Sequence, residues 1–439
     1  MFYFLMHKNT KVALCRDGIT TDVFDEKKIP IGAKKTDNNQ YDLTDWENER
    51  KIPEDRTNFH KIKETLKKIN VEENVLHRYN YGLSLTDTYW FYEIDGSYLV
   101  IKMKLKLKSF DKEIPKYEDI NYFDKKFTAG LLEKTLHNQE VVLEDIKTPD
   151  ITTNGKTQKY WVVRQGKFFL VKQNDSIQNY IAEKELLASF IAYLINECRI
   201  EGKKKAISTA AYQFEKGKTN DENCCYSEIF TSKDESLVTY KMLTNQSKWI
   251  YKHKKLEAFI NEHPEIKGLR EFMEFIIIFD FITENNRDES DIGFICNNGT
   301  NTILRPAPIY GSGNCIEFMK KDFTRANHEL YSSNHINVFG MNEEKQCKYI
   351  AENIKWFAPE MLYRKSDMFL EYLVNTDMSG LPRQYRDNLA DWVKYKIVMI
   401  ANARRQMAIA EEANADGNNN KKVNSDGEII DDKDIEDNY

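Results

Sequence analysis

The sequence predicts an α+β protein in which a β-rich lobe is followed by a helical lobe, with an α/β accessory module in front of both. Alternating apolar and polar residues, typical of half-buried strands, predominate in residues 136–235, together with one helix. Apolar residues at helical spacing predominate in residues 236–410. The 439 residues are 41% hydrophobic and 31% charged, which favours packed domains over a disordered chain.

Charge is distributed unevenly along the chain. The formal net charge is −6, but residues 411–439 contain ten acids and three lysines and therefore carry −7 by themselves. The remaining body is thus close to neutral, at +1. Proteins that bind nucleic acid usually present a strongly basic face. We therefore expect no direct binding of nucleic acid.

Cysteine usage and apolar runs bear on the cellular compartment. Seven cysteines are scattered, with one adjacent pair at Cys224 and Cys225, and none stands at zinc-binding spacing. An odd number of thiols is typical of a reducing compartment. The N-terminus lacks the pattern of a signal peptide, and the run "FMEFIIIFDFI" is too short to span a bilayer. We expect a cytoplasmic protein without a membrane segment.

Residues 1–135 are predicted to form the accessory module. The alternation in "FYFLMHKNTKVALCRDG" predicts a hairpin with its turn at Lys8 and Asn9. The stretch "LTDWENERKIPEDRTNFHKIKETLKKINV" is predicted to be helical, with Pro53 near the start of its second helix. Most of Gly96–Phe110, with lysines at every second position, is typical of a strand or hairpin with one exposed face. Residues 119–128, "DINYFDKKFT", are predicted to form an aromatic docking segment.

The two lobes and a tail follow. In the β-rich lobe, "YWVVRQGKFFLVK" predicts two strands joined at Gln165 and Gly166, and "NYIAEKELLASFIAYLINE" predicts an amphipathic helix. In the helical lobe, "FINEHPEIKGLREFMEFIIIFDFI" and "YRDNLADWVKYKIVMIANARRQMAIAEEA" are the clearest helices. Residues 411–439 contain few apolar side chains and are predicted to be a disordered acidic tail.

A β-rich lobe beside a helical lobe can hold a nucleotide between them, and phosphoryl transfer needs few further parts. These are a backbone loop over the phosphates, a lysine held by a glutamate, a positioned base and oxygen ligands for magnesium. The candidate lysine is Lys172, which ends the strand "KFFLVK", and the following helix offers Glu183 and Glu185 as partners. A lysine at the end of an apolar strand is more often a surface residue, so this pair alone is weak evidence.

The candidate phosphate loop is "TTNGKTQKYW", which contains Gly155 and Lys159. Gly155 would allow the backbone to approach an anion closely. A plain hairpin turn explains the same spacing equally well. Further along, "GFI" and "LRPAPIYGSG" are predicted to be two strands of a small sheet. The polar loop before this sheet and the turn after it could meet at a metal site.

Together these stretches resemble the HipA-like and CtkA-like bacterial serine/threonine kinases, in the subgroup with an extended N-terminal module. "TTNGKTQKYW", "FFLVK" and "EKELLAS" resemble the nucleotide loop, lysine strand and glutamate helix of the family, and "NCCYSEIF" resembles its strand pair before the hinge. "FDFITENNRDESDIGFI" and "RPAPIYGSGNCI" resemble its catalytic and metal-binding loops. The resemblance implies a two-lobed kinase-like fold of the HipA type. It also implies ATP and magnesium as cofactors, with Gly155, Lys159, Lys172 and Glu185 at the nucleotide.

The same resemblance exposes departures in both catalytic loops. The family's catalytic loop reads D-R-H-x-x-N-x-G, in which the Asp is the base and the Asn binds metal. Here Asn286 stands at the base position, Asp288 at the His position and Asp291 at the metal-ligand position. In the second metal motif, A-P-I-F/Y-D-x-G, Gly311 replaces the Asp. An amide cannot accept the hydroxyl proton of a substrate, and a positioned base typically supplies roughly 10²–10⁴-fold in rate.

Three functions follow from these substitutions. The favoured one is a catalytically impaired kinase, or pseudokinase, that acts as a nucleotide- or partner-binding regulatory module. The alternative is an active, toxin-like serine/threonine kinase that uses Asp288 as a substitute base or Asp291 in an altered role. A different phosphoryl- or nucleotidyl-transfer activity is the third. The resemblance also implies a protein substrate or regulatory partner, which could be a small DNA-binding protein.

Overall fold

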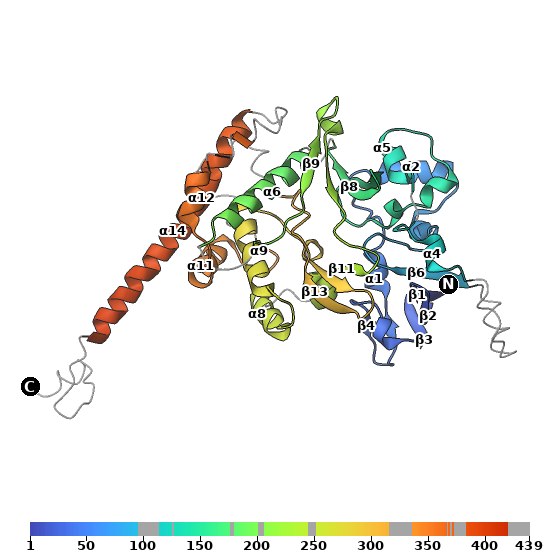
Figure 1. Ribbon diagram of the computed structural model, residues 1–439, viewed down its shortest axis with the longest axis horizontal. Coiled ribbons are helices and arrows are strands. Elements are labelled where there is room, and N and C mark those ends of the chain that lie inside the picture. The colour runs from blue at the N-terminus through green and yellow to red at the C-terminus, as the bar shows by residue number, and fades with distance from the viewer. Residues whose placement is uncertain are drawn as a thin grey trace, which may run out of the picture.

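The computed structural model describes residues 1–94, 114–124, 127–175, 180–200, 206–244, 252–315, 336–366, 368, 371–372 and 383–419. The strand or hairpin predicted over Gly96–Phe110 lies outside these residues, as does the predicted tail beyond Asn419. The described residues form three antiparallel sheets and a set of helices. Most of the longer helices come from the C-terminal half of the chain (Figure 1). The predicted α+β class is confirmed.

The first sheet belongs to the predicted accessory module and has the strand order β4-β5-β3-β2-β1-β6. The N-terminal hairpin is confirmed, because β1 and β2 pair from His7 and Thr10 onward across a turn at Lys8 and Asn9. Strand β6 pairs with the other edge of β1. The strands are β1 (Phe2–His7), β2 (Thr10–Arg16), β3 (Ile19–Val23), β4 (Lys34–Lys35), β5 (Tyr41–Asp42) and β6 (Tyr89–Ile94).

Short helices and an aromatic segment attach this module to the second sheet. The second predicted helix begins at Phe59, later than Pro53, because residues 49–58 form turns around Arg56. The predicted aromatic docking segment is confirmed in its described part, where Phe127 stacks on Phe168 of β8 at 5.9 Å between ring centroids. The helices are α1 (Thr44–Asn48), α2 (Phe59–Lys68), α4 (Tyr117–Ile120) and α5 (Leu131–Leu136), with 3₁₀ helices η1 (Glu26–Lys28), η2 (Glu73–Arg78), η4 (Leu143–Ile146) and η5 (Pro149–Thr152).

The second sheet has the order β7-β8-β10-β9 and forms the β-rich lobe. The predicted turn between β7 and β8 is confirmed, with Gln165 and Gly166 both at positive φ (51° and 77°), as a tight hairpin requires. The predicted helix is α6, whose apolar side chains pack with the helical lobe. The elements are β7 (Lys159–Arg164), β8 (Lys167–Gln173), α6 (Ile181–Glu197), β9 (Tyr212–Glu215), η6 (Asn220–Glu222) and β10 (Cys224–Glu228).

The third sheet, β11-β12-β13, lies beside α8 and α9, with α1 and β4 of the accessory module on its other side (Figure 1). Its strands β12 and β13 were predicted from "GFI" and "LRPAPIYGSG". Strand β11 follows residues 229–234, the hinge segment that connects it to β10. Helix α9 is the core of the helical lobe, because nearly every residue from Leu269 to Thr283 is buried. The elements are β11 (Glu235–Thr239), α7 (Tyr240–Thr244), α8 (Lys252–Glu262), α9 (Leu269–Thr283), η8 (Glu289–Asp291), β12 (Gly293–Asn297), β13 (Thr302–Pro306), α11 (Glu343–Asn353) and α12 (Pro359–Lys365).

The last described helix corrects one prediction. Helix α14 (Arg383–Asn419) continues into residues 411–419, which were predicted to be disordered. The alanines and glutamates of "AIAEEANA" are strong helix formers, and they extend a helix whose Trp392 and Ile397 are anchored in the core. Its C-terminal half extends away from the body (Figure 1). Among the described residues, no helix combines the length and apolar character that crossing a membrane requires.

Candidate functional site

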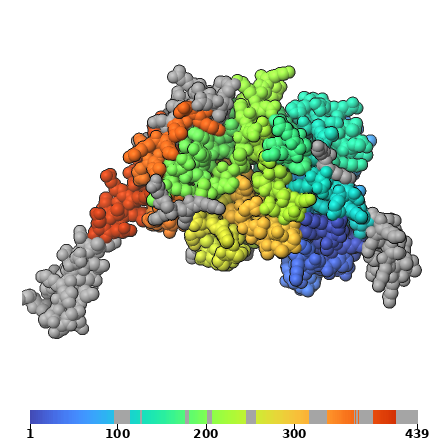
Figure 2. Space-filling view, viewed as in Figure 1, coloured from blue at the N-terminus to red at the C-terminus, as the bar shows by residue number. Residues whose placement is uncertain are grey.

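A cavity of about 220 Å³ lies where the accessory module, the β-rich lobe and the helical lobe meet. Five of the predicted site residues line it together: Gly155, Lys159, Lys172, Asp291 and Gly311. Around them the walls combine hydroxyl and apolar side chains from the segment after β10, from β11 and from the accessory module. Figure 2 shows the accessory module, in blue and cyan, directly against both other parts of the chain.

Lys172 and Glu185 form a buried ion pair, as the resemblance implied. The Lys172 ammonium donates to Glu185 Oε1, and the other carboxylate oxygen accepts from the backbone N–H of Ser312 at 3.0 Å. Burial by itself would lower the pKa of Lys172, but the Glu185 carboxylate outweighs it and holds this pKa above its ordinary value. Glu183, the other glutamate offered by the sequence, instead accepts from the amides of Asn174 and Asn223.

Lys159 lies beside Lys172 because the two residues are direct partners across β7 and β8. Side chains of paired residues share a face of the sheet, and like charges placed so destabilise it. Burial, together with the nearby Arg56 and Lys172, lowers the pKa of Lys159 to about 7. Among the described residues, Lys159 forms no ion pair. The cavity therefore contains an ammonium group that is suited to an anionic ligand.

The candidate phosphate loop runs from the end of η5 into β7, so it is not the turn of a hairpin. Gly155 has φ +98°, and a Cβ there would lie 2.5 Å from Lys159 Nζ, so glycine makes room for the ammonium. Arg56 of the accessory module fixes the loop by donating to the carbonyls of Thr153 (2.6 Å) and Gly155 (2.9 Å). Glu49 accepts from Asn154 in the same loop.

The catalytic loop is shaped by one buried arginine. Arg287 Nε donates to both carboxylate oxygens of Asp280 on α9, at 3.1 and 3.0 Å. Its Nη1 donates to the carbonyls of Asp291 (3.2 Å) and Tyr310 (2.9 Å), so it ties the catalytic loop to the metal-loop candidate. The carboxylate and the two carbonyls together supply hydrogen-bond acceptors and an opposite charge to the buried guanidinium, which offsets the cost of burying it.

The structure separates Asn286 and Asp288 from the cavity lining. Both are exposed. The Asp288 carboxylate caps η8, accepting from Ser290 N at 2.9 Å and from Ser290 Oγ at 2.5 Å. Proposed as a substitute base, Asp288 thus has its carboxylate engaged within its own loop.

Asp291 occupies the space that a side chain at position 311 would need. A Cβ on Gly311 would lie 2.7 Å from Asp291 Oδ1, and Gly311 has φ +70°, a conformation that favours glycine. Burial raises the pKa of Asp291, whereas Arg287, Lys172 and Lys159 act to lower it. The Asp291 carboxylate therefore lies where a side chain at position 311 would be.

A magnesium ion fits this arrangement only in part. The described residues contain no group of three or more His, Cys, Asp or Glu side chains placed to hold a metal ion. Magnesium bound with a nucleotide commonly takes one or two carboxylates and completes its shell with phosphates and water. Asp291 can supply one such carboxylate, and Gly311 supplies none.

Sequence reasoning missed the accessory-module residues of the site. Arg56, Glu49, Ser84 and Thr86 contact the phosphate loop or line the cavity. The stretch "GLSLTDT" did show closely spaced hydroxyls, but no local pattern indicates which distant segment they meet. Such contacts are set by the docking of the module on the lobes.

Comparisons with known proteins give the fold. No protein-family model matches the chain, and no curated protein matches it. HipA of Shewanella oneidensis MR-1, in the structure of a toxin–antitoxin system of HipA, HipB and operator DNA, is similar with a TM-score of 0.51 and 10% identity, over 92% of this chain and 99% of that chain. The proinflammatory kinase CtkA of Helicobacter pylori is similar with a TM-score of 0.43 and 13% identity, over 58% of this chain and 95% of that chain. The match to HipA shows that the chain has a HipA-like, two-lobed kinase-like fold.

Proposed function

We propose that this protein binds a nucleoside triphosphate in the cavity between its lobes and is impaired in transferring the γ-phosphoryl group. It would then act as a regulatory module of the pseudokinase type. The observation that carries this proposal is the pair of neighbouring ammonium groups, Lys159 and Lys172, of which Lys159 has no ion-pair partner in the described chain. Phosphate oxygens are the ligands that such a pair fits best.

The remaining walls suit the rest of a nucleotide. Leu170, Ile229, Leu237 and Met242 offer apolar surface to a base, and hydroxyl groups lie among them. Ligand sites commonly combine an apolar lining with a few convergent polar groups. The Lys172–Glu185 pair would orient the phosphates without any role in proton transfer.

Impairment rests on the two substituted positions. Asn286 cannot act as a base, and Gly311 has no side-chain oxygen with which to bridge a metal and the phosphates. Bound magnesium would neutralise phosphate charge, and Asp291 is the chain's candidate ligand for it. The loss of a base alone removes roughly 10²–10⁴-fold in rate.

One observation favours the alternative, an active kinase. The Asp291 carboxylate lines the cavity, and burial raises its pKa toward the range in which a carboxylate accepts protons effectively. In this alternative Asp291 takes the proton of a substrate hydroxyl. The same residue would then be unable to serve as an anionic metal ligand at that step.

A binding partner for this protein is inferred by analogy with the HipA structure, which contains HipB and operator DNA. We propose a protein partner for this chain, and a small DNA-binding protein is one candidate. The nearly neutral body argues that any contact with DNA would be made through that partner.

The proposal is tested by measuring binding and transfer separately. Thermal-shift titrations with ATP, with and without magnesium, should raise the melting temperature of the wild type but leave a Lys172→Ala variant unshifted. Incubation with labelled ATP and magnesium or manganese should leave the protein unlabelled. Strong labelling that depends on Lys172 would establish the active kinase instead, and its loss in Asp291→Asn would assign the base.

A further inference from the structure

A segment of the accessory module forms part of the cavity wall. Ser84 and Thr86, which lie between the turn at Gly82 and strand β6, line the cavity beside residues of the two lobes. Their hydroxyls lie 2.8 Å apart, and Thr86 N donates to Ser84 Oγ at 3.1 Å. A bond between two hydroxyls uses only one of their two hydrogens. One hydroxyl hydrogen thus remains to donate to a ligand.

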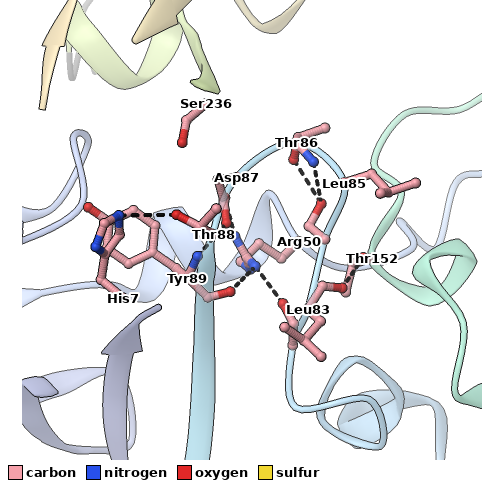
Figure 3. A network of polar contacts seen from close by, with 12 residues as sticks. His7, Arg50, Leu83, Leu85, Thr86, Asp87, Thr88, Tyr89, Thr152 and Ser236 are labelled. Atoms are coloured by element: carbon pink, nitrogen blue, oxygen red, sulfur yellow. Dashed lines mark hydrogen bonds and ion pairs between the residues drawn. The ribbon is translucent and has the colours of Figure 1, made fainter. Parts of the chain in front are cut away.

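A buried arginine holds this segment in place (Figure 3). Arg50 pairs with Asp87 and donates to the carbonyls of Gly82 and, at 3.0 Å, Tyr89. Asp87 also accepts from Tyr89 N at 2.9 Å. The acceptors of Arg50 lie at both ends of the segment, at Gly82 and at Asp87 and Tyr89. Arg50 therefore fixes the backbone that carries Ser84 and Thr86.

The segment also forms hydrogen bonds with the phosphate loop on one side and with the hinge and β11 on the other. Thr152, the first residue of the phosphate loop, donates to Leu83 O at 2.8 Å. On the hinge side, Thr231 donates to Leu85 O at 2.9 Å, and Leu237 N of β11 donates to Thr86 O at 2.7 Å. The accessory segment therefore bridges the phosphate loop and the hinge across one side of the cavity.

Strand register places the hinge away from the lysines. Lys172 pairs with Cys225, and Glu228, the last residue before the hinge, pairs with Phe169. Three residues along a strand correspond to about 10 Å. A ligand whose phosphates contact Lys159 and Lys172 would therefore bring its nucleoside part toward the hinge, where the accessory segment lies.

We propose that Ser84 and Thr86 contact the nucleoside part of the bound nucleotide, so that the accessory module sets the affinity and selectivity of the site. This inference rests on the proposed nucleotide binding and deepens it. It predicts that these hydroxyls distinguish a nucleotide from a bare polyphosphate, whereas Lys159 does not.

The test uses ATP and inorganic tripolyphosphate as paired probes in calorimetric titrations of the full chain. A Ser84→Ala, Thr86→Val variant should bind ATP roughly 3- to 10-fold more weakly, the range expected for a lost neutral hydrogen bond. Its affinity for tripolyphosphate should stay within about twofold of the wild type, because no phosphate contact is removed. Thr86→Phe keeps the backbone bond to Leu237 and fills the wall, so it should weaken ATP binding at least as much.

Thr88→Val is the matched control. Thr88 is in the same segment, but its hydroxyl bonds with His7 at 3.1 Å and does not line the cavity. This variant should bind both probes as the wild type does. Equal effects of the Ser84 and Thr86 changes on both probes, or no effect on either, would overturn the inference. If the wild type binds neither probe, the proposed nucleotide binding fails and this inference fails with it.

Discussion

The charged residues on the two sides of the cavity differ in burial and in pairing. On the β-rich side, Lys172 and Glu185 are buried and paired, and the carboxylate is further held by a backbone N–H. On the helical side, Asn286 and Asp288 are exposed, and the carboxylate that lines the cavity, Asp291, fills space beside Gly311. The parts suited to holding phosphates are in place, and those needed for proton and metal chemistry are rearranged.

This difference teaches that binding and transfer are separable on this fold. Lys172 and Glu185 also join β8, α6 and the turn at Ser312, so packing preserves them whether or not a ligand is turned over. Asn286 and Asp288 lie on an exposed loop whose shape depends on Arg287. Changes in that loop can remove chemistry without loss of the fold.

The largest effect should come from the residue that shapes the catalytic loop. Arg287→Ala removes the guanidinium that pairs with the buried Asp280 carboxylate, which should lower the free energy of unfolding by about 3–5 kcal/mol. Urea denaturation measures this change. Arg305→Ala, at an exposed pair with Glu235, is the control and should cost at most about 1 kcal/mol. Similar losses for both variants would show that Arg287 does not organise the loop.

Next in size is the loss of the unpaired ammonium. Lys159→Met should weaken ATP binding by about 1.5–3 kcal/mol, the contribution of a hydrogen bond to a charged group. Because the substitution also removes a like charge from beside Lys172, the unliganded protein should not lose stability. Calorimetric titration and thermal melting check the two statements. Unchanged affinity for ATP would remove the observation on which the proposed function depends.

A carboxylate restored at 311 should be poorly tolerated. Gly311→Asp places a side chain at positive φ and against Asp291, which should cost about 1–3 kcal/mol of stability. Adding Asp291→Asn should recover part of this loss by removing one negative charge. Thermal melting of the single and double variants makes the comparison. If Gly311→Asp alone is as stable as the wild type, Asp291 does not occupy the missing side chain's place.

The smallest expected effect is a dependence of binding on pH. Burial lowers the pKa of Lys159 to about 7, and a bound phosphate favours the charged form. The cation is therefore present below pH 7 and is lost above it, so ATP affinity should fall as pH rises from 6 to 8, by up to about tenfold per unit. Lys159→Met should lack this component while retaining any titration of ATP itself. Parallel pH profiles for the two proteins would contradict the assignment.

Local patterns predicted the elements of this structure better than the contacts between them. The β7–β8 hairpin and helix α6 followed from alternation and helical spacing, because these patterns are set within one segment. The choice of Glu185 over Glu183 as the partner of Lys172 required the resemblance. Helix α14 ran further than its composition suggested because its start is anchored in the core.

The contribution of the accessory module to the site could not be predicted from the sequence. Arg56 binds the phosphate loop across about one hundred residues of chain, and Ser84 lines the cavity from a segment that Arg50 holds in place. Each contact depends on how separate units dock, and hydrophobic periodicity carries no such information. The clash between Asp291 and a side chain at 311 is likewise visible only in three dimensions.

The central claim, binding of ATP without transfer, is tested most directly with ATP labelled both on the base and on the γ-phosphate. After incubation of the full chain with this ATP and magnesium, bound and free material are separated and the ratio of the two labels is measured. The account predicts that both labels leave the protein together as intact ATP when it is denatured. Retention of the γ label on the denatured protein, with release of the base label and dependence on Lys172, would contradict it.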